Sequence, residues 1–181
     1  DFTSYITNAK NSGAQAIFAP TSISYAQLIV EAAATQKVGI PLYAGDTWDS
    51  NVILQAAKDK DVTINITTFY QEGGNQEFDD GFKKWLNADS SKLTNNGGND
   101  IVSAVSAMGY DAYFTALEAI KAANSTEPAK IMEALWNVQY KGVTGDIQFD
   151  SVNGDAERTV AYIKAADTTT GAWTFVKEQG I

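Results

Sequence analysis

Hydrophobic and polar positions in the first half of the chain follow an order that predicts strands joined by helices. Residues 14–19 and 40–44 are short apolar runs of the kind that form buried strands. Between them, hydrophobic residues 28–33 recur at helical spacing, with Ser24 as the expected N-cap and Gly39 at the end. Strand, helix and strand in about thirty residues predict a βαβ unit.

The same pattern repeats before residue 71. A helix with an apolar face at 52–57, capped by Ser50, leads into the β-branched run 62–70. Connections between parallel strands cross over in the right-handed sense, which places each helix relative to the sheet. The sequence therefore predicts an α/β fold: a parallel, Rossmann-like βαβ sheet with helices on both faces.

Beyond residue 71 the pattern becomes mostly helical and then returns to strands. The polar run 88–98 is rich in Asn, Ser and Gly and predicts a loop. The predicted helices are 76–86, 101–123 and 128–136, and the predicted strands are 143–149, 159–166 and 173–177, the last two joined by a turn at 168–171. This order indicates two lobes connected by several crossings of the chain.

Composition excludes several classes of function. The chain has 22 acidic and 13 basic side chains, a formal net charge of −9, which opposes binding to nucleic acid. It has no Cys and no His, which excludes disulfides, thiol nucleophiles, imidazole-based triads and the usual zinc sites. Residues 95–100 and 150–155 lack the calcium-loop pattern, and the glycine pairs lack the phosphate-loop pattern. We expect no metal, no cofactor and no nucleic-acid partner.

The candidate binding residues lie where the strand 40–44 ends. Ligands in open parallel sheets bind beyond the carboxyl ends of the strands, where Asp46, Thr47 and Trp48 stand. A carboxylate in this place suits a cationic group such as an α-ammonium. Alternatively, Asp46 caps a turn through Asx geometry, as we expect of Asp49 and Ser50.

Several motifs, in their order and spacing, resemble the type I periplasmic binding protein family, and most of all the branched-chain amino-acid receptors of ABC importers. The resemblance covers nearly the whole chain. It rests on Asp-Phe-Thr at 1–3 before a helix, 17–21, 45–50, 109–112, 142–150 and Asn-Gly-Asp at 153–155. It implies a two-lobed fold, an amino-acid ligand, an ABC permease as partner and no enzymatic activity. It also implies a place outside the cytoplasm, in a periplasm or lipid-anchored at the cell surface.

By this resemblance the chain corresponds to the C-terminal half of the family. Residues 1–70 and 157–181 would belong to lobe II, and 71–156 to lobe I with the crossings between lobes. Asp46 would pair with the ligand's α-ammonium, Thr21 would line the cleft after the preceding strand, and Thr47 and Trp48 would form its wall. The chain looks like a processed or truncated piece, and surfaces uncovered by truncation would favour self-association.

Other functions stay open on the sequence alone. A type I lobe can also serve as a sensor or as a receptor for an amide, urea, a short peptide or an aromatic acid. In a different class, Asp46 and Asp49 would act as the paired carboxylates of a glycosidase, with Trp48 as a platform for a sugar. For a receptor, the expected mechanism is closure of a hinge around the ligand.

Overall fold

A five-stranded mixed sheet is the centre of the fold in the computed structural model, which describes residues 1–157 and 159–180. The strand order is β1-β2-β3-β6-β7. The strands are β1 (Ile17–Phe18), β2 (Leu42–Ala44), β3 (Ile64–Thr68), β6 (Val160–Asp167) and β7 (Ala172–Gly180). β1, β2 and β3 are parallel, whereas β6 and β7 run antiparallel to their neighbours. The predicted α/β fold with a mainly parallel sheet flanked by helices is confirmed. The prediction of helices on both faces is wrong for β1, β2 and β3, because one face of these strands is exposed.

Helices in the N-terminal part cover the sheet and form the main core. They are α1 (Thr3–Asn11), α2 (Ile23–Thr35) and α3 (Asn51–Ala57), with a 3-10 turn η1 (Asp46–Trp48) before α3. Apolar side chains of α2 and α3 pack on alternate residues of the strands, such as Leu42, Ala44, Ile64 and Ile66. The period of two along each strand therefore decides which strand residues enter the core.

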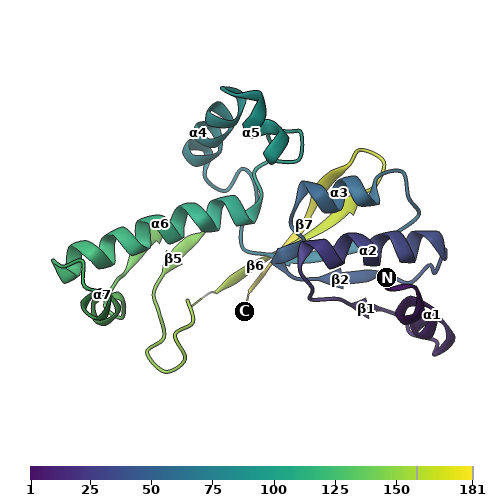
Figure 1. Ribbon diagram of the computed structural model, residues 1–181, viewed down its shortest axis with the longest axis horizontal. Helices are drawn as coiled ribbons and strands as arrows, with labels where there is room; N and C mark the ends of the chain where they lie inside the picture. The colour runs from purple at the N-terminus through teal and green to yellow at the C-terminus, as the bar shows by residue number, and fades with distance from the viewer. Residues whose placement is uncertain (158, 181) are drawn as a thin grey trace.

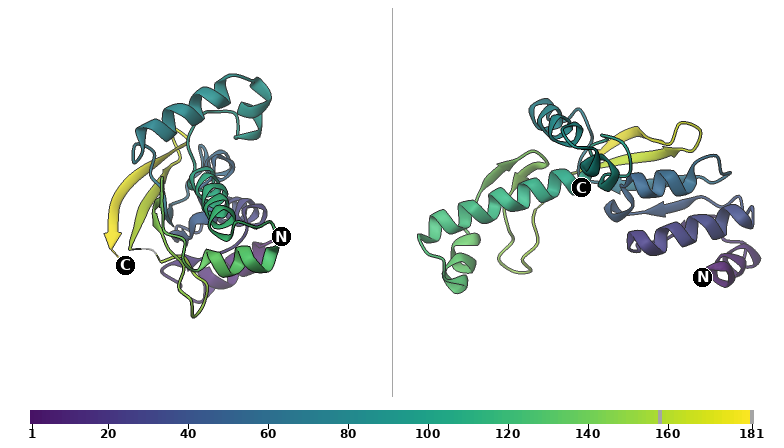
Figure 2. Two further views of the ribbon diagram at one scale, coloured as in Figure 1. Left: turned by 90° about the vertical axis from the view of Figure 1, so that its left-hand side faces the viewer. Right: turned by 45° about the horizontal axis from the view of Figure 1, so that its top comes forward.

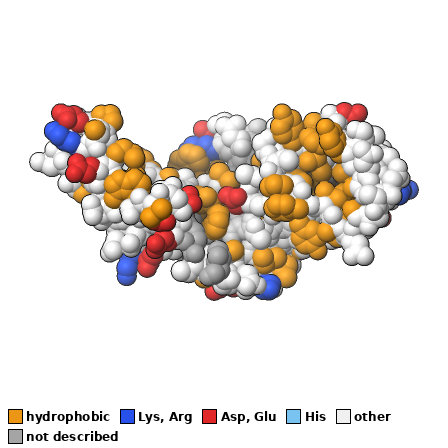
Figure 3. Space-filling view, turned by 90° about the horizontal axis from the view of Figure 1, so that it is seen from below, with side chains coloured by type: hydrophobic (Ala, Val, Ile, Leu, Met, Phe, Trp, Pro, Cys, Tyr) orange, Lys and Arg blue, Asp and Glu red, His pale blue; other side chains and the backbone are white. Residues whose placement is uncertain are grey.

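The opposite face of the sheet carries exposed aromatic side chains. Phe18 pairs with Tyr43 in the parallel register, and their side chains are 72% and 44% exposed. The predicted burial of the whole run 14–19 is therefore wrong, since Ala19 is its one buried residue. Phe18 is exposed because α2 and α3 both pack on the other face. Figure 3 shows hydrophobic side chains gathered over the half of the molecule that holds β1 and α2. Self-association stays a prediction. The exposed hydrophobic side chains, Phe18 and Tyr43 among them, form a surface through which two copies could associate.

The central part of the chain lies outside this sheet. It comprises α4 (Gln76–Asn87), α5 (Ser90–Asn95), α6 (Ala104–Ala123), α7 (Pro128–Leu135), β4 (Tyr140–Gly142) and β5 (Gly145–Ile147). Figures 1 and 2 show α6 running from the sheet outwards, with α7 and the β4–β5 hairpin beside it and α4 and α5 as a separate pair. The three helices predicted here are confirmed to within a few residues, and Pro128 lies in the first turn of α7 as expected.

Three local predictions were wrong. The run 88–98 contains the short helix α5, because the Asp89 side chain accepts a hydrogen bond from Ser91 N at 2.8 Å and caps it. The run 143–149 is not one strand, since the chain turns at 143–144 between β4 and β5. Ser24 lies inside α2, which begins at Ile23 after the extended Ser22.

Two turn and cap predictions are confirmed. The Ser50 side chain accepts a hydrogen bond from Val52 N at 3.2 Å at the start of α3. Gly171 has a φ of +72° in the turn between β6 and β7, where its N–H donates to Asp167 O at 2.9 Å. A positive φ is strained for most residues but not for glycine, so this position specifies the hairpin.

The β4–β5 hairpin is held to α6 by the buried carboxylate of Asp111. It accepts hydrogen bonds from Val143 N at 2.8 Å, Thr144 N at 2.8 Å and Thr144 Oγ1 at 2.6 Å. A β-carbon at Gly142 would overlap with the Asp111 carboxylate, so only glycine fits there without movement of the carboxylate.

We predict that Gly142→Ala destabilises the protein by about 1–3 kcal/mol, as overpacking of a close contact does. Gly109→Ala is the matched control, because Gly109 is an exposed position inside α6 with nothing within 4 Å of an added β-carbon. That variant is expected to gain about 0.5–1 kcal/mol from better helix propensity. Urea unfolding of both variants measures the difference, and equal stabilities would contradict the close contact at Gly142.

Candidate functional site

The predicted binding residues lie in two loops that meet at one edge of the sheet. β1 and β2 are parallel, and Ala19 N donates to Tyr43 O at 2.8 Å just where both strands end. The Thr47 side-chain hydroxyl then donates to Thr21 O at 2.9 Å, which fastens the loop after β2 to the loop after β1. The structure therefore brings Thr21, Asp46 and Thr47 together at the carboxyl ends of two neighbouring strands.

Asp46 carries a negative charge that its surroundings do not compensate. It is half-buried at the start of η1, where its carbonyl oxygen accepts from Asp49 N at 2.9 Å. Within 1–157 and 159–180, no residue donates a hydrogen bond to its carboxylate and no Lys or Arg pairs with it. The alternative role as an Asx cap has no bond to support it. The carboxylate is available to an external donor.

Trp48 and Thr21 have less exposed positions than a cleft wall requires. The Trp48 ring is completely buried in the main core, so in this structure it offers no surface to a ligand. Its packing instead fixes the backbone that carries Asp46 and Thr47. Thr21 is half-buried, and its hydroxyl oxygen is enclosed with no hydrogen-bond partner among the described residues. Thr47, in contrast, is exposed at the surface of the loop.

Asp49 belongs to the interior and pairs with a residue that the sequence analysis missed. Its side chain is 1% exposed, and its Oδ2 atom lies 2.9 Å from Lys164 Nζ in β6. Lys164 could have been noticed as a lone charge within the apolar strand 160–166. With Asp49 paired and Trp48 enclosed, the residues proposed for a glycosidase do not form a substrate site.

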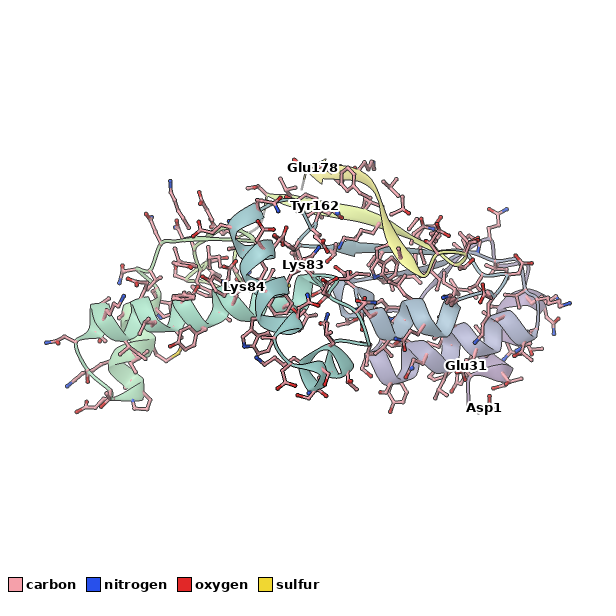
Figure 4. The ribbon with its side chains drawn as sticks, turned by 90° about the horizontal axis from the view of Figure 1, so that it is seen from above. Asp1, Glu31, Lys83, Lys84, Tyr162 and Glu178 are labelled. Atoms are coloured by element: carbon pink, nitrogen blue, oxygen red, sulfur yellow. The ribbon has the colours of Figure 1, made fainter. Side chains whose placement is uncertain are left out.

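Further polar contacts lie just after the end of β3, where the chain leaves the sheet. Glu72 forms an ion pair with Lys83 of α4, labelled in Figure 4, and accepts from Val102 N at 2.9 Å. The hydrogen bond that Lys83 donates to the Glu72 carboxylate raises the pKa of Lys83. The Tyr70 hydroxyl donates to Asp79 Oδ1 at 2.7 Å, and burial, with that bond, raises the pKa of Tyr70. These contacts hold α4 and the start of α6 in place beside the end of β3.

Two hollows lie away from Asp46. One of about 450 Å³ is lined by aromatic side chains of α4 and α6, among them Phe78, Phe82 and Trp85. Another of about 550 Å³ lies between the turn at 142–146 and β6. Neither includes Asp46, Thr21 or Thr47 in its lining. The candidate site is therefore an open edge in this chain, and enclosure of a ligand there requires further protein surface.

Metal and membrane features were also sought. In the part of the chain that the structure describes, no group of three or more acidic side chains is placed to hold a metal ion. Over the same residues, no helix has the length and apolar character to cross a bilayer.

Comparison with known proteins identifies the family. A sequence model of the periplasmic binding protein family matches residues 1–170. The chain belongs to this family. No match was found among curated protein sequences.

Solved structures of solute-binding proteins have the same fold. The chain is similar to the leucine-binding protein LivK of Thermotoga maritima, with 24% identity and a TM-score of 0.71 over 98% of this chain. It is also similar to LivJ of Streptococcus pneumoniae in complex with isoleucine, with 20% identity and a TM-score of 0.66, and to a solute-binding protein of R. palustris in complex with benzoate, with 15% identity and a TM-score of 0.75. The last two comparisons cover 100% of this chain. In each case the chain spans about half, 48%, of the length of the other protein.

Proposed function

We propose that this protein is the solute-binding component of an ABC importer and that it binds a small amino acid, with a branched-chain amino acid as the first candidate. The observation that carries this proposal is the uncompensated Asp46 carboxylate at the carboxyl end of β2. A ligand's α-ammonium would form a charge-assisted hydrogen bond there, worth about 1.5–3 kcal/mol net. The leucine and isoleucine named for two of the similar structures are consistent with such a ligand.

The proposal assigns the rest of the binding site to a second lobe. Residues 1–70 and 157–181 form part of lobe II, and residues 71–156 form part of lobe I with the crossings. Because Asp46 stands on an open edge, lobe I must supply the groups that hold the ligand's carboxylate. Binding then bridges the lobes and shifts the population to a closed form.

Partner and location follow from the same proposal. A closed, loaded receptor of an importer presents its ligand to a membrane permease, which places this protein outside the cytoplasm, in a periplasm or anchored by lipid at the cell surface. The role requires binding without turnover, so we infer that the protein is not an enzyme.

A receptor for an aromatic acid is the second candidate, and benzoate bound to one similar structure favours it. Benzoate has no ammonium group, and its carboxylate would meet the like charge of Asp46 at close range. Asp46 would therefore attract an amino-acid ligand and repel an aromatic acid, so the two candidates make opposite predictions for this residue. Of the other solutes named above, an amide and urea are distinguished by the thermal-melting experiment described next.

We predict that leucine, isoleucine or valine raises the melting temperature of the full natural chain, whereas benzoate, acetamide and urea at low millimolar concentration do not. A ligand at 100 times its dissociation constant stabilises the native state by about 2.7 kcal/mol. Thermal melting with each compound is the measurement. A shift with benzoate and none with the amino acids would overturn the proposal in favour of the second candidate.

A further inference from the structure

A buried ion pair joins the candidate ligand loop to β6, and the carboxylate of that pair also accepts a hydrogen bond from the first residue of α6. We propose that the Asp49–Lys164 pair is a positioning device, which holds the loop 46–49 against α6 and so couples ligand binding at Asp46 to the orientation of the helical part of the chain. This inference rests on the proposed function and adds two residues that do not themselves touch the ligand.

Four segments meet at one carboxylate oxygen. Asp49 Oδ2 accepts hydrogen bonds from Lys164 Nζ at 2.9 Å, from the Thr68 hydroxyl at 2.8 Å and from Ala104 N at 3.3 Å. The side chains of Lys164 and Asp49 are only 4% and 1% exposed. An ion pair this well enclosed is little screened by solvent, and it needs these extra hydrogen bonds to offset its desolvation.

Two of the four segments, β3 and β6, connect the sheet with the rest of the molecule. Asp49 follows η1 directly, and Thr68 is the last residue of β3, from which the chain leaves the sheet. Ala104 is the first residue of α6, and Lys164 lies within β6, the strand by which the chain returns. Figure 1 shows the start of α6 close to the sheet and its end far from it. A small rotation at Ala104 would therefore move the far end of the 20-residue helix α6 a long way.

The pair also separates the roles of two neighbouring carboxylates. Asp49 is balanced by Lys164 and by the positive end of the α6 dipole, since it accepts from the first backbone N–H of that helix. Asp46, three positions earlier, has neither partner. The loop therefore presents one uncompensated charge to a ligand while the other charge holds the loop in place.

The second carboxylate oxygen of Asp49 accepts no hydrogen bond from the described residues. Asp49 Oδ1 is buried and has no hydrogen-bond partner among residues 1–157 and 159–180. A buried acceptor without a partner is costly, which is unexpected in a contact optimised for stability alone. It leaves the carboxylate able to take a different donor if the segments around it rearrange.

The test separates positioning from stability by removing both charges together in the full natural chain. Asp49→Leu with Lys164→Met replaces the pair by apolar side chains, which often leaves stability unchanged or raised. The measurements are the melting temperature, backbone amide hydrogen exchange in segments 46–49 and 104–106, and leucine affinity by calorimetry. Asp49→Asn with Lys164→Gln is the second variant, to be used if the first does not fold.

For the double variant we expect a melting temperature within a few degrees of the wild type, exchange at least tenfold faster in both segments, and leucine affinity reduced at least tenfold. The matched control is Glu118→Gln with Lys121→Gln, which removes an exposed ion pair of α6 and is expected to change none of the three. Unchanged exchange in either segment, or faster exchange with unchanged affinity, would overturn the positioning role. If the wild type binds no leucine, the proposed ligand is contradicted, and the exchange rates still decide whether the pair holds the loop to α6.

Discussion

Asp46→Asn is expected to weaken amino-acid binding by the full natural chain about 10- to 100-fold, the loss that corresponds to one charge-assisted hydrogen bond. The substitution keeps the size of the side chain and its ability to accept a hydrogen bond, but it removes the charge. The melting temperature without ligand should not change, because no described residue bonds to this carboxylate. Calorimetric titration measures the affinity.

Asp61→Asn is the matched control for this experiment. Asp61 is exposed and precedes β3, so it lies at the opposite edge of the sheet from Asp46. Asp61→Asn changes the net charge of the protein by the same amount as Asp46→Asn. We expect the amino-acid affinity of this control variant to equal that of the wild type. Equal affinities for all three proteins would remove Asp46 from the site.

Asp49→Ala is expected to destabilise the protein by about 3–5 kcal/mol, because it leaves Lys164 buried without a counter-charge. Thr68 and Ala104 N lose their acceptor in the same substitution. Urea unfolding of the full natural chain gives the free energy, and a change of this size is a large part of the stability of an ordinary domain.

A surface ion pair provides the comparison. Glu118→Ala removes the exposed partner of Lys121 and is expected to change the free energy of unfolding by less than about 1 kcal/mol. If Asp49→Ala costs no more than this control, the pair is not enclosed in solution in the way that its 4% and 1% exposures indicate.

Local signals in the sequence predicted much of the secondary structure. Ser50 caps α3, Pro128 begins α7 and Gly171 makes the β6–β7 turn, each because the residue itself restricts or satisfies the backbone beside it. The predictions for the runs 88–98 and 143–149 were wrong because the contacts that decide their structure leave no pattern in the sequence. Asp89 stabilises a helix of only six residues, which is too short to show a helical periodicity of hydrophobic residues. Asp111 holds its turn from 32 positions away, so no local sequence pattern indicates that contact.

The candidate site was partly predictable. Parallel strands end at the same edge of a sheet, so the meeting of Thr21 with Thr47 could be expected from the order of the strands alone. The direction of the Trp48 side chain could not be predicted, because an aromatic residue just after a strand can line a cleft or pack in a core. In the structure the turn η1 directs Trp48 into the core. Lys164 lies 115 positions from Asp49, and only the folded sheet brings them together.

The central claim is that Asp46 recognises the ammonium group of an amino acid, and one calorimetric comparison tests it most directly. The full natural chain is titrated with leucine and with 4-methylpentanoate, which has the same carbon skeleton and carboxylate but no amino group. The account predicts that leucine binds at least tenfold more tightly and that Asp46→Asn removes most of this difference. Equal affinities for the two compounds, or tighter binding of 4-methylpentanoate, would contradict it.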